Sequence, residues 1–434
     1  MSAMTPRARA LAGAAAVVVV AASLAALFVA GHRGGAGPAA GGRYHAQRPL
    51  GLDFFTQRSI GTPPEGAPWI SDLLVVDLDG DGLKDILVAD GRRNRISWIR
   101  QVRLGVFEEQ DVGQPVAGPA HLEVADMNGT GHLDILVSSM GVIPPSNDKV
   151  GSVVVLENDG TNHFTNRVLI KDVARVTYVQ AAKLAGSGRL DLVVGQFGYL
   201  QGEVRWLENL GNWQFRSHPL LDLPGTVHAP VADLEGDGKP EIVALVTHNV
   251  EEVHVLWGDG RGHFRDQVAY GSSNKDYGMS GLCVADMNQD GRPDIVFTNG
   301  DGFDYAVPGS RPWHGVQWLE NRGQGKFVFH RIADFPGAYS PCVADLTGSG
   351  RLDIVSCCGF NDWSDPSAVS LMAFENEGSG RFTPRVLAHY PTHLIVVKAA
   401  DFFNDGRTEL VTGAFMFYPP YEHVSRVTLW EPRP

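Results

Sequence analysis

A nine-residue loop recurs seven times along this chain of 434 residues, and its spacing constrains the fold more than any other feature. In its fullest form the loop runs from Asp77 to Asp85 as DLDGDGLKD and leads straight into the apolar run ILV. The seven copies begin at Asp77, Asp126, Lys183, Asp233, Asp286, Asp345 and Asp401. Their spacing of roughly 50 residues, with strand-like segments between the loops, predicts a propeller or a solenoid.

Each repeat carries four strand signals. An apolar segment precedes the loop and a β-branched run follows it, as at residues 122–125 and 134–137. A third strand, such as residues 204–207, leads to a turn that in several repeats reads Glu-Asn-x-Gly, and the fourth strand opens with Phe, as at residues 164–169. Four antiparallel strands per repeat, repeated radially, make the blades of a propeller.

The two ends of the repeat array indicate how the ring closes. The seventh repeat stops after its third strand, at residues 427–430, without a Phe-led fourth strand. Residues 55–60 (FTQRSI) match the fourth strand at residues 164–169 (FTNRVL), and pairing them into the last blade would remove the exposed edges of an open array. We therefore predict an all-β fold with a single seven-bladed β-propeller over residues 51–434, closed by an N-terminal strand.

The N-terminus carries an uncharged apolar run at residues 11–30, preceded by Arg7 and Arg9. We expect this run to form a hydrophobic helix that is long enough to span a bilayer, and the basic flank places residues 1–10 in the cytoplasm. We favour an uncleaved signal anchor over a cleaved signal peptide. For cleavage after Ala30, the large residue Phe28 would stand at the −3 position, where signal peptidase sites have a small residue. Residues 31–50 are rich in Gly and Ala and are expected to form a flexible linker. Either reading places the propeller outside the cytoplasm, tethered at a membrane or secreted.

The formal net charge of −13 and the lack of a basic stripe argue against nucleic-acid binding. Many of the acids lie in the repeated loops, where bound cations would offset part of the charge. Side-chain oxygens at alternate loop positions can converge on one hard cation, and Gly at the sixth position allows the sharp turn. We expect mainly structural Ca²⁺, which takes about six to eight oxygen ligands.

Five loops carry the expected ligand sets. These are Asp77, Asp79, Asp81 and Asp85; Asp126, Asn128, Thr130 and Asp134; Asp233, Glu235, Asp237 and Glu241; Asp286, Asn288, Asp290 and Asp294; and Asp345, Thr347, Ser349 and Asp353. In the third loop we expect Lys183 to replace the metal by pairing with Asp191, and Phe403 weakens the seventh loop. An EF-hand is excluded because its twelfth position would be Val88 in the first loop, where Glu is required, and because the flanks are strand-like.

The loops resemble the FG-GAP/VCBS repeats of integrin α-subunit propellers and of many bacterial surface proteins. The resemblance covers about residues 52–434. It implies a calcium-binding propeller in which the main-chain carbonyls of Leu83 and Arg292 add ligands. It is a poor guide to function, because the family includes adhesion modules, lectins and a few enzymes.

Strand order places the cation loops on one rim and the loops between second and third strands on the other. Those second loops are irregular and hold aromatic side chains: Tyr199, Tyr305, Trp313, Trp363, Tyr418 and Tyr421. Aromatic residues on variable loops above a rigid scaffold are typical of ligand surfaces, although the same rings could simply pack the loops together. We predict that a glycan or a protein binds here, as expected of an adhesion or carbohydrate-binding module.

An enzymatic alternative rests on the innermost strands, which should gather Asp72, His121, Glu123 and His228 near the mouth of the central channel. These groups could bind a transition metal or serve a lyase or dehydratase that acts on sugars, with His121 and His228 as bases or ligands. A solvated channel lining is the simpler interpretation. A scaffold for a larger envelope assembly is a third possibility.

The chain has four cysteines, Cys283, Cys342, Cys357 and Cys358. An even number in an oxidising compartment suggests disulfides. Cys283 and Cys342 hold equivalent positions in neighbouring blades, and Cys342 also lies one strand from Cys357, so the sequence leaves the pairing open.

Overall fold

The structure, a computed structural model, describes residues 49–144, 146–303 and 309–434. In these ranges the chain is all-β, with strands arranged in seven separate sheets. The hydrophobic segment expected at residues 11–30 and most of the expected linker lie outside the described residues. Among the described residues there is no helix with the length and hydropathy needed to span a bilayer.

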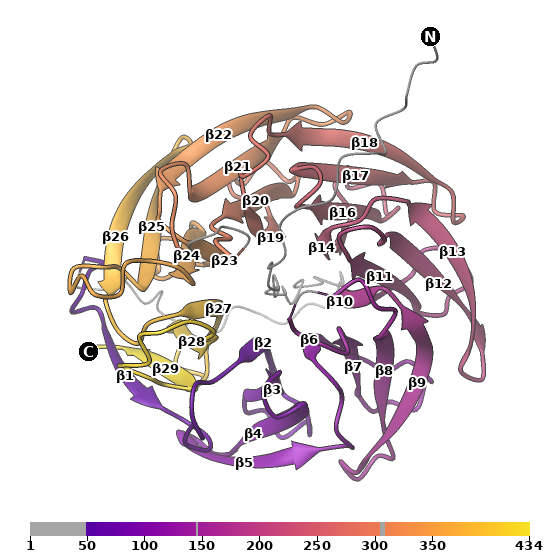
Figure 1. Ribbon diagram of the computed structural model, residues 1–434, viewed down its shortest axis with the longest axis horizontal. Helices are drawn as coiled ribbons and strands as arrows, with labels where there is room; N and C mark the ends of the chain where they lie inside the picture. Colours follow the sequence, from indigo (N-terminus) through magenta and orange to yellow (C-terminus); the bar gives the residue numbers. More distant parts are fainter. Residues whose placement is uncertain (1–48, 145, 304–308) are drawn as a thin grey trace, which may run out of the picture.

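The seven sheets stand around a central axis as the blades of a propeller (Figure 1). Blade 1 contains β2 (Ile70–Val76), β3 (Asp85–Asp90), β4 (Arg95–Arg103) and β5 (Val106–Val112). Blade 2 contains β6 (Pro119–Ala125), β7 (Asp134–Ser139), β8 (Gly151–Asn158) and β9 (Phe164–Val173). Blade 3 contains β10 (Arg175–Ala182), β11 (Asp191–Phe197), β12 (Val204–Gly211) and β13 (Gln214–Leu221). Within each of these blades, each strand pairs antiparallel with the next one along the chain.

The remaining blades repeat this order. Blade 4 contains β14 (Thr226–His228), β15 (Val231–Ala232), β16 (Glu241–Val246), β17 (Glu252–Gly258) and β18 (Phe264–Gly271). Blade 5 contains β19 (Met279–Ala285), β20 (Asp294–Asn299), β21 (Gly315–Asn321) and β22 (Phe327–Asp334). Blade 6 contains β23 (Ala338–Ala344), β24 (Asp353–Cys358), β25 (Leu371–Gly378) and β26 (Arg381–Ala388). Pro230 divides the inner strand of blade 4 into β14 and β15, since proline donates no ladder hydrogen bond.

The last sheet joins the two ends of the described chain. It contains β27 (Leu394–Ala400), β28 (Glu409–Ala414), β29 (Val427–Pro432) and β1 (Phe55–Ser59). β1 pairs antiparallel with β29, so that Phe55 lies opposite Pro432 and Ser59 opposite Thr428. Figure 1 shows these two strands side by side at the outer edge of the blade.

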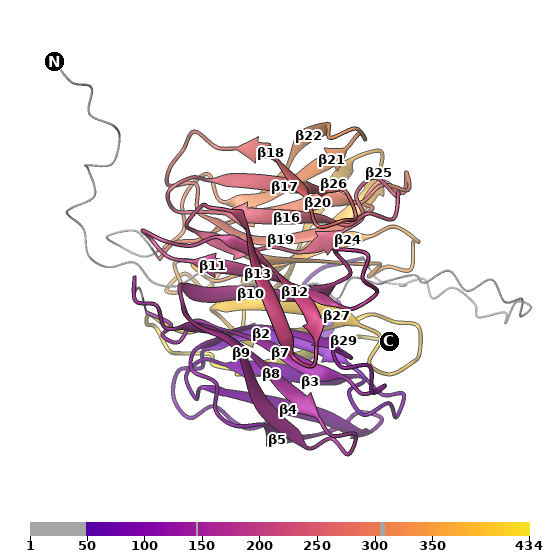
Figure 2. The same cartoon turned by 90° about the vertical axis from the view of Figure 1, so that its right-hand side faces the viewer.

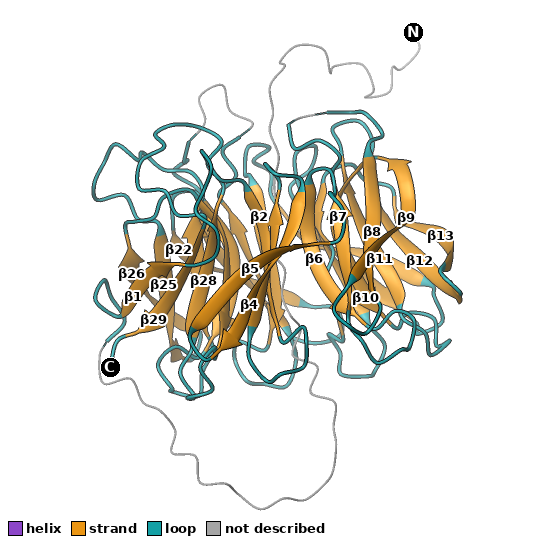
Figure 3. Ribbon diagram, turned by 90° about the horizontal axis from the view of Figure 1, so that it is seen from below, coloured by secondary structure: helices purple, strands orange, loops and turns teal. Residues whose placement is uncertain are grey.

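The core lies between neighbouring blades. The second strand of each blade is buried along its whole length, for example β3 and β20, because both of its faces pack against adjacent sheets. The outermost strands, such as β13, alternate exposed and part-buried residues. Figures 2 and 3 show the consequence: connecting loops gather at the two ends of the ring. One end holds the cation loops, and the other holds the loops between second and third strands.

All four cysteines are free and buried, so the expected disulfides are absent. On the paired strands β23 and β24, Cys342 lies opposite Val355, whereas Cys357 lies opposite Tyr339. Cys283 and Cys342 lie on inner strands of different sheets, which share no ladder hydrogen bonds. A disulfide requires close, correctly directed Cβ atoms, and equivalent position in the repeat does not guarantee that geometry.

Candidate functional site

The acid at the ninth position of each cation loop braces the loop through the main chain. Asp85 Oδ2 accepts a hydrogen bond from the Leu78 amide (3.2 Å), and Asp85 Oδ1 accepts one from the Gln101 amide (2.8 Å). In all seven loops this acid accepts the second-position amide; the seven acids are Asp85, Asp134, Asp191, Glu241, Asp294, Asp353 and Glu409. Because the bond also forms in the Lys183 loop, a structural brace explains this acid without a metal.

The loop from Asp77 to Asp85 fits a calcium ion best. Among the described residues, Asp77, Asp79 and Asp85 are the one group of acids, histidines or cysteines that brings three ligand atoms within 4.8 Å of one another. Asp77 Oδ2 accepts the Gly82 amide (2.9 Å), whereas the buried Asp77 Oδ1 receives no hydrogen bond. Burial raises the pKa of Asp85 to about 6, as expected of a carboxylate held without a cation.

A guanidinium group already contacts this loop. Arg100 forms an ion pair with Asp79, and its Nη2 lies 3.7 Å from Asp81 Oδ2. The guanidinium carbon also lies 5.5 Å from the ring centroid of Trp98. Arg100 is therefore placed to neutralise the loop when no metal is bound.

Three other loops pair their fifth-position carboxylate with a basic side chain at the seventh position. The nitrogen–oxygen distance is 2.5 Å for Lys239–Asp237, for Arg292–Asp290 and for Arg407–Asp405. The first-position acids are occupied as well, since Asp233, Asp286 and Asp401 each accept the amides of the fifth and sixth positions. Glu235 accepts the amides of Gln324 and Gly325 in the next blade.

The second and sixth loops are held by main-chain amides in the same way. Asp126 accepts the amides of Thr130 and Gly131, and Asp345 accepts those of Ser349 and Gly350. Asn128 of the second loop donates to Glu157 of its own blade. In the fifth loop, Asn288 donates to Asp290 and Glu320. Among the described residues, these loops do not bring three charged ligand atoms together as the first loop does.

The third loop departs from the prediction. Lys183 forms no ion pair with Asp191, whose carboxylate oxygens accept the amides of Leu184 (3.3 Å) and Asn209 (2.8 Å). Main-chain amides already donate to both oxygens of this buried acid, and the Lys183 side chain is exposed at the loop surface. The predicted lysine–aspartate substitution for a metal is therefore wrong.

The inner strands bring the predicted channel residues together, but in the interior. Asp72, His121 and His228 have no exposed surface, and Glu123 is partly exposed. Tyr178 lies on the strand between the two histidines, with ring centroids 4.0 Å from His121 and 5.9 Å from His228. This placement explains why the two imidazoles are not part of a three-ligand metal group.

The charges in this interior cluster are arranged around Lys398. Its ammonium lies 3.4 Å from Asp72 Oδ1, and Asp72 Oδ2 accepts the Leu122 amide of the next blade (3.0 Å). Burial raises the pKa of Glu123 to about 8, and burial lowers that of His228 to about 3. Asp72 is thus a link between inner strands, and both histidines are held neutral at physiological pH.

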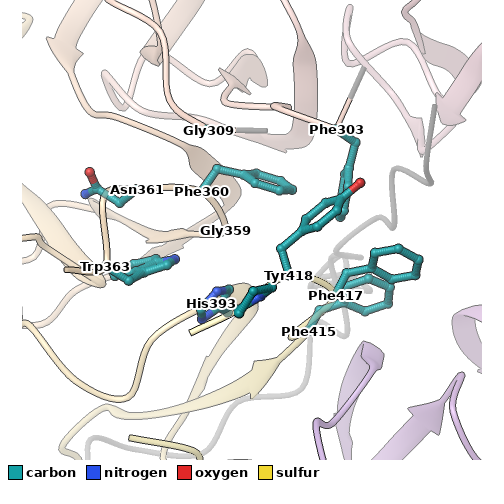
Figure 4. A pocket seen from close by; sticks show the side chains of 11 residues that line it. Phe303, Gly309, Gly359, Phe360, Asn361, Trp363, His393, Phe415, Phe417 and Tyr418 are labelled. Atoms are coloured by element: carbon teal, nitrogen blue, oxygen red, sulfur yellow. The ribbon is translucent and has the colours of Figure 1, made fainter. Parts of the chain in front are cut away.

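On the opposite rim, a small hollow lies between the loops of blades 5, 6 and 7 (Figure 4). It has a volume of about 50 Å³. Its lining residues are mostly aromatic: Phe303, Gly309, Gly359, Phe360, Asn361, Trp363, His393, Phe415, Phe417, Tyr418 and Pro419. The Trp363 ring lies 5.2 Å from His393, and Phe303 lies 5.8 Å from Tyr418. Burial lowers the pKa of His393 to about 4, so the hollow carries no charge at neutral pH.

The six predicted aromatic residues do not form one surface. Trp363 and Tyr418 line the hollow, and the neighbouring Tyr421 is 51% exposed. Tyr199 packs against Phe197 and His248 above blades 3 and 4. Trp313 donates its indole N–H to the Asp276 carbonyl (2.7 Å). Tyr305 lies outside the described residues.

Sequence reasoning missed the phenylalanines of the hollow and His393. Phe360 and Phe415 come within two residues of the ends of the second strands of blades 6 and 7, and this shared placement was a usable signal. Phe303 contacts Phe360 with ring centroids 4.3 Å apart and lies 6.0 Å from Phe417. His393 lies in the connection between β26 of blade 6 and β27 of blade 7. Its place in the hollow therefore depends on how these two blades pack, which the sequence pattern does not show.

Comparisons with known proteins agree with this fold. Two solved structures, "Crystal structure of BBS1N in complex with ARL6DN, soaked with mercury" and the same complex "soaked with lead", match with TM-scores of 0.51 and 0.52. Both are 10% identical in sequence, and each match covers 88% of this chain and 98% of the other chain, so the likeness concerns the fold alone. No curated protein matches the sequence.

A family model gives the assignment. The model for the FG-GAP-like repeat matches residues 77–137, 184–244, 233–297 and 298–356, which together make up more than half of the chain. Each match contains at least one of the acidic loops and at least the first residues of the strand that follows it. The chain therefore belongs to the FG-GAP-like repeat family.

Proposed function

We propose that this protein is an extracytoplasmic binding module, braced by calcium on one rim, that holds a protein ligand on the other rim. The observation that carries the proposal is the uncharged aromatic hollow formed by the loops of three blades. Propellers of this repeat family typically lie outside the cell, which agrees with the location expected from the N-terminal segment.

The size and lining of the hollow favour a protein over a glycan. A volume of about 50 Å³ accepts one small apolar group but does not enclose a sugar ring. Phe360 and Phe415 are almost fully buried in its walls, and Trp363 and Tyr418 are partly exposed at its rim. An apolar side chain inserted among aromatic residues is the usual anchor of a protein interface.

Calcium belongs to the same proposal as a brace. The loop from Asp77 to Asp85 is the best candidate, because Asp77 Oδ1 is buried without a hydrogen bond and three acids converge there. Bound Ca²⁺ would neutralise these acids and displace Arg100 from Asp79. The loops of blades 4, 5 and 7 have their own basic partners and should bind calcium more weakly.

The enzymatic alternative gains no support from the inner strands. His121 and His228 have no exposed surface, so a substrate could reach them only after the inner strands had moved. Asp72 already accepts two main-chain amides and lies near Lys398, which accounts for its burial.

Binding measurements with a rim variant test the proposal. The full chain and its Trp363→Ala variant would be compared on arrays of extracytoplasmic proteins and of glycans. We expect at least one protein to bind and Trp363→Ala to weaken that binding at least tenfold. Leu200→Ala, which changes an exposed apolar residue (73% exposed) on the same rim of blade 3, is the matched control. Binding that depends equally on both residues, or that survives Trp363→Ala, would contradict the proposal.

A further inference from the structure

A cavity of about 650 Å³ lies on the cation-loop rim between blades 2 and 3, far larger than the aromatic hollow. In Figure 1 these blades are the neighbouring sheets β6–β9 and β10–β13. The side chains that line it and bear on its chemistry are Asp126, Asn128, Lys183, Arg189, Asn212 and Trp213. Its volume is typical of small-molecule sites, which usually measure about 300–1,000 Å³.

The backbone at Trp213 is unusual. Asn212 and Trp213 form the two-residue turn between β12 and β13, and both are left-handed, with φ of 52° and 59°. Gly105 and Gly380 occupy the second place in the equivalent two-residue turns of blades 1 and 6. A bulky residue in this conformation is a true outlier, and such strain concentrates at functional sites.

The Trp213 side chain reaches across to blade 2. Its indole N–H donates to Glu157 Oε1 (3.1 Å), and the Arg167 guanidinium carbon lies 5.0 Å from its ring centroid. These contacts fix the indole at the wall of the cavity. The indole also packs against the hydrophobic core of these blades, and the part that lines the cavity offers an apolar surface to the C–H face of a sugar.

Lys183 supplies an uncommitted charge at the same place. It replaces the aspartate that opens the other six loops, it is exposed, and within the described chain no carboxylate pairs with it. Arg189 adds a second positive charge, although its Nε donates to the Asn209 carbonyl (2.7 Å). Asp126 is the one acid that lines the cavity, so the lining carries a net positive charge.

We propose that this cavity binds an acidic saccharide, in which the sugar ring packs on Trp213 and a carboxylate pairs with Lys183. The exposed side chain of Asn212 is placed to meet a sugar hydroxyl. Uronic-acid oligosaccharides have this chemistry. The site is separate from the protein-binding hollow and does not depend on it.

Calorimetric titration of the full chain tests the proposal. The ligands would be uronic-acid oligosaccharides and, as controls, the neutral oligosaccharides obtained by reducing their carboxylates to alcohols. The panel would contain oligomers of galacturonate, glucuronate and mannuronate. We expect at least one acidic oligomer to bind at least tenfold more tightly than its neutral counterpart. Lys183→Gln should weaken that binding at least tenfold, whereas Lys171→Gln, at a residue whose side chain is 74% exposed on β9, should not.

Trp213→Gly separates binding from stability. Glycine adopts the left-handed turn without strain, so the variant keeps the hairpin but loses the indole together with its contacts to Glu157, Arg167 and the neighbouring core. We expect a folded variant that still unfolds in one cooperative transition but no longer binds the saccharide. The proposal is overturned if no acidic oligomer binds, if Lys183→Gln binds as tightly as the parent, or if Trp213→Gly keeps full binding.

Discussion

The side-chain amide of Asn321 donates a hydrogen bond to the main-chain carbonyl of Leu234, 2.8 Å away, and so ties blade 5 to the cation loop of blade 4. The same link recurs from Asn376 to the Met287 carbonyl (3.1 Å) and from Gln101 to the Phe402 carbonyl (3.1 Å). The end of the third strand therefore joins neighbouring blades.

Removing this link should destabilise the ring. Asn321→Ala leaves the carbonyls of Leu234 and Pro293 without their side-chain donor, whereas Asn209→Ala removes a donor only from Leu190 of its own blade. We expect Asn321→Ala to lower the free energy of unfolding by about 1–3 kcal/mol more than Asn209→Ala. Equilibrium denaturation of the two variants measures the difference. Equal losses would show that the inter-blade bond contributes nothing.

Calcium binding should depend chiefly on the first loop. Asp77→Asn keeps an oxygen for the Gly82 amide but removes one of the converging charges. We expect the tightest calcium site, and most of the rise in melting temperature that calcium causes, to be lost in this variant. Asp233→Asn is the matched change in a loop that has its own Lys239–Asp237 pair, and it should retain both. The reverse outcome would place the main site in blade 4.

Arg100 should compete with calcium for the first loop. Its guanidinium pairs with Asp79, so calcium must displace it. The Asp79 side chain is buried but the Arg100 side chain is 41% exposed, so we take the pair to contribute about 1 kcal/mol, as for a surface ion pair, and expect Arg100→Ala to tighten calcium binding about fivefold. Arg95→Ala, on the same strand but paired with Asp111, is the control. Weaker binding after Arg100→Ala would mean that Arg100 supports the site.

Glu123 should make stability depend on pH. Burial raises its pKa in the folded protein from 4.5 to about 8, so between these values the unfolded chain releases a proton that the folded chain keeps. Raising the pH across this window therefore favours unfolding, and its full effect is at most a few kcal/mol, or about 1.4 kcal/mol per pH unit. Glu123→Gln removes the effect. The melting temperature of the variant, relative to that of the parent, should rise as the pH rises from 5 to 8. A difference that does not change with pH would refute the raised pKa of Glu123.

The four thiols should be unreactive until the chain unfolds. All are buried, and burial raises the pKa of Cys342 to about 11 and that of Cys283 well above its usual value. A thiol reagent should modify no cysteine in the native protein and all four after denaturation without reductant. Modification of only two in the denatured protein would reveal a disulfide.

The fold was largely predictable because its signals are local. The loop from Asp77 to Asp85 and the strands around it lie within one repeat, so their period gave the number of blades and the order of strands. The role of Asn321 was not predictable, because its partner Leu234 is 87 residues away in sequence. The predicted pair between Lys183 and Asp191 failed for a related reason. The carboxylate of Asp191 already accepts two main-chain amides, and no sequence pattern shows such bonds.

The candidate site was predictable only as a rim. Trp363 and Tyr418 were identified from their loops, but Tyr199 and Trp313 pack elsewhere, since loop position does not determine which blades a side chain contacts. The cysteines failed in the same way, because equivalent places in a repeat do not set the distance between Sγ atoms.

Photo-crosslinking from the rim tests the central claim most directly. A photoreactive residue would replace Asn361, which lines the aromatic hollow, or Lys171, which is exposed on the outer strand β9. On cells that produce the full chain, we predict that the Asn361 position captures one defined protein and that Trp363→Ala abolishes the capture. The Lys171 position should not capture it. Capture of the same protein from Lys171 alone, or capture from Asn361 that persists with Trp363→Ala, would contradict a protein-binding rim.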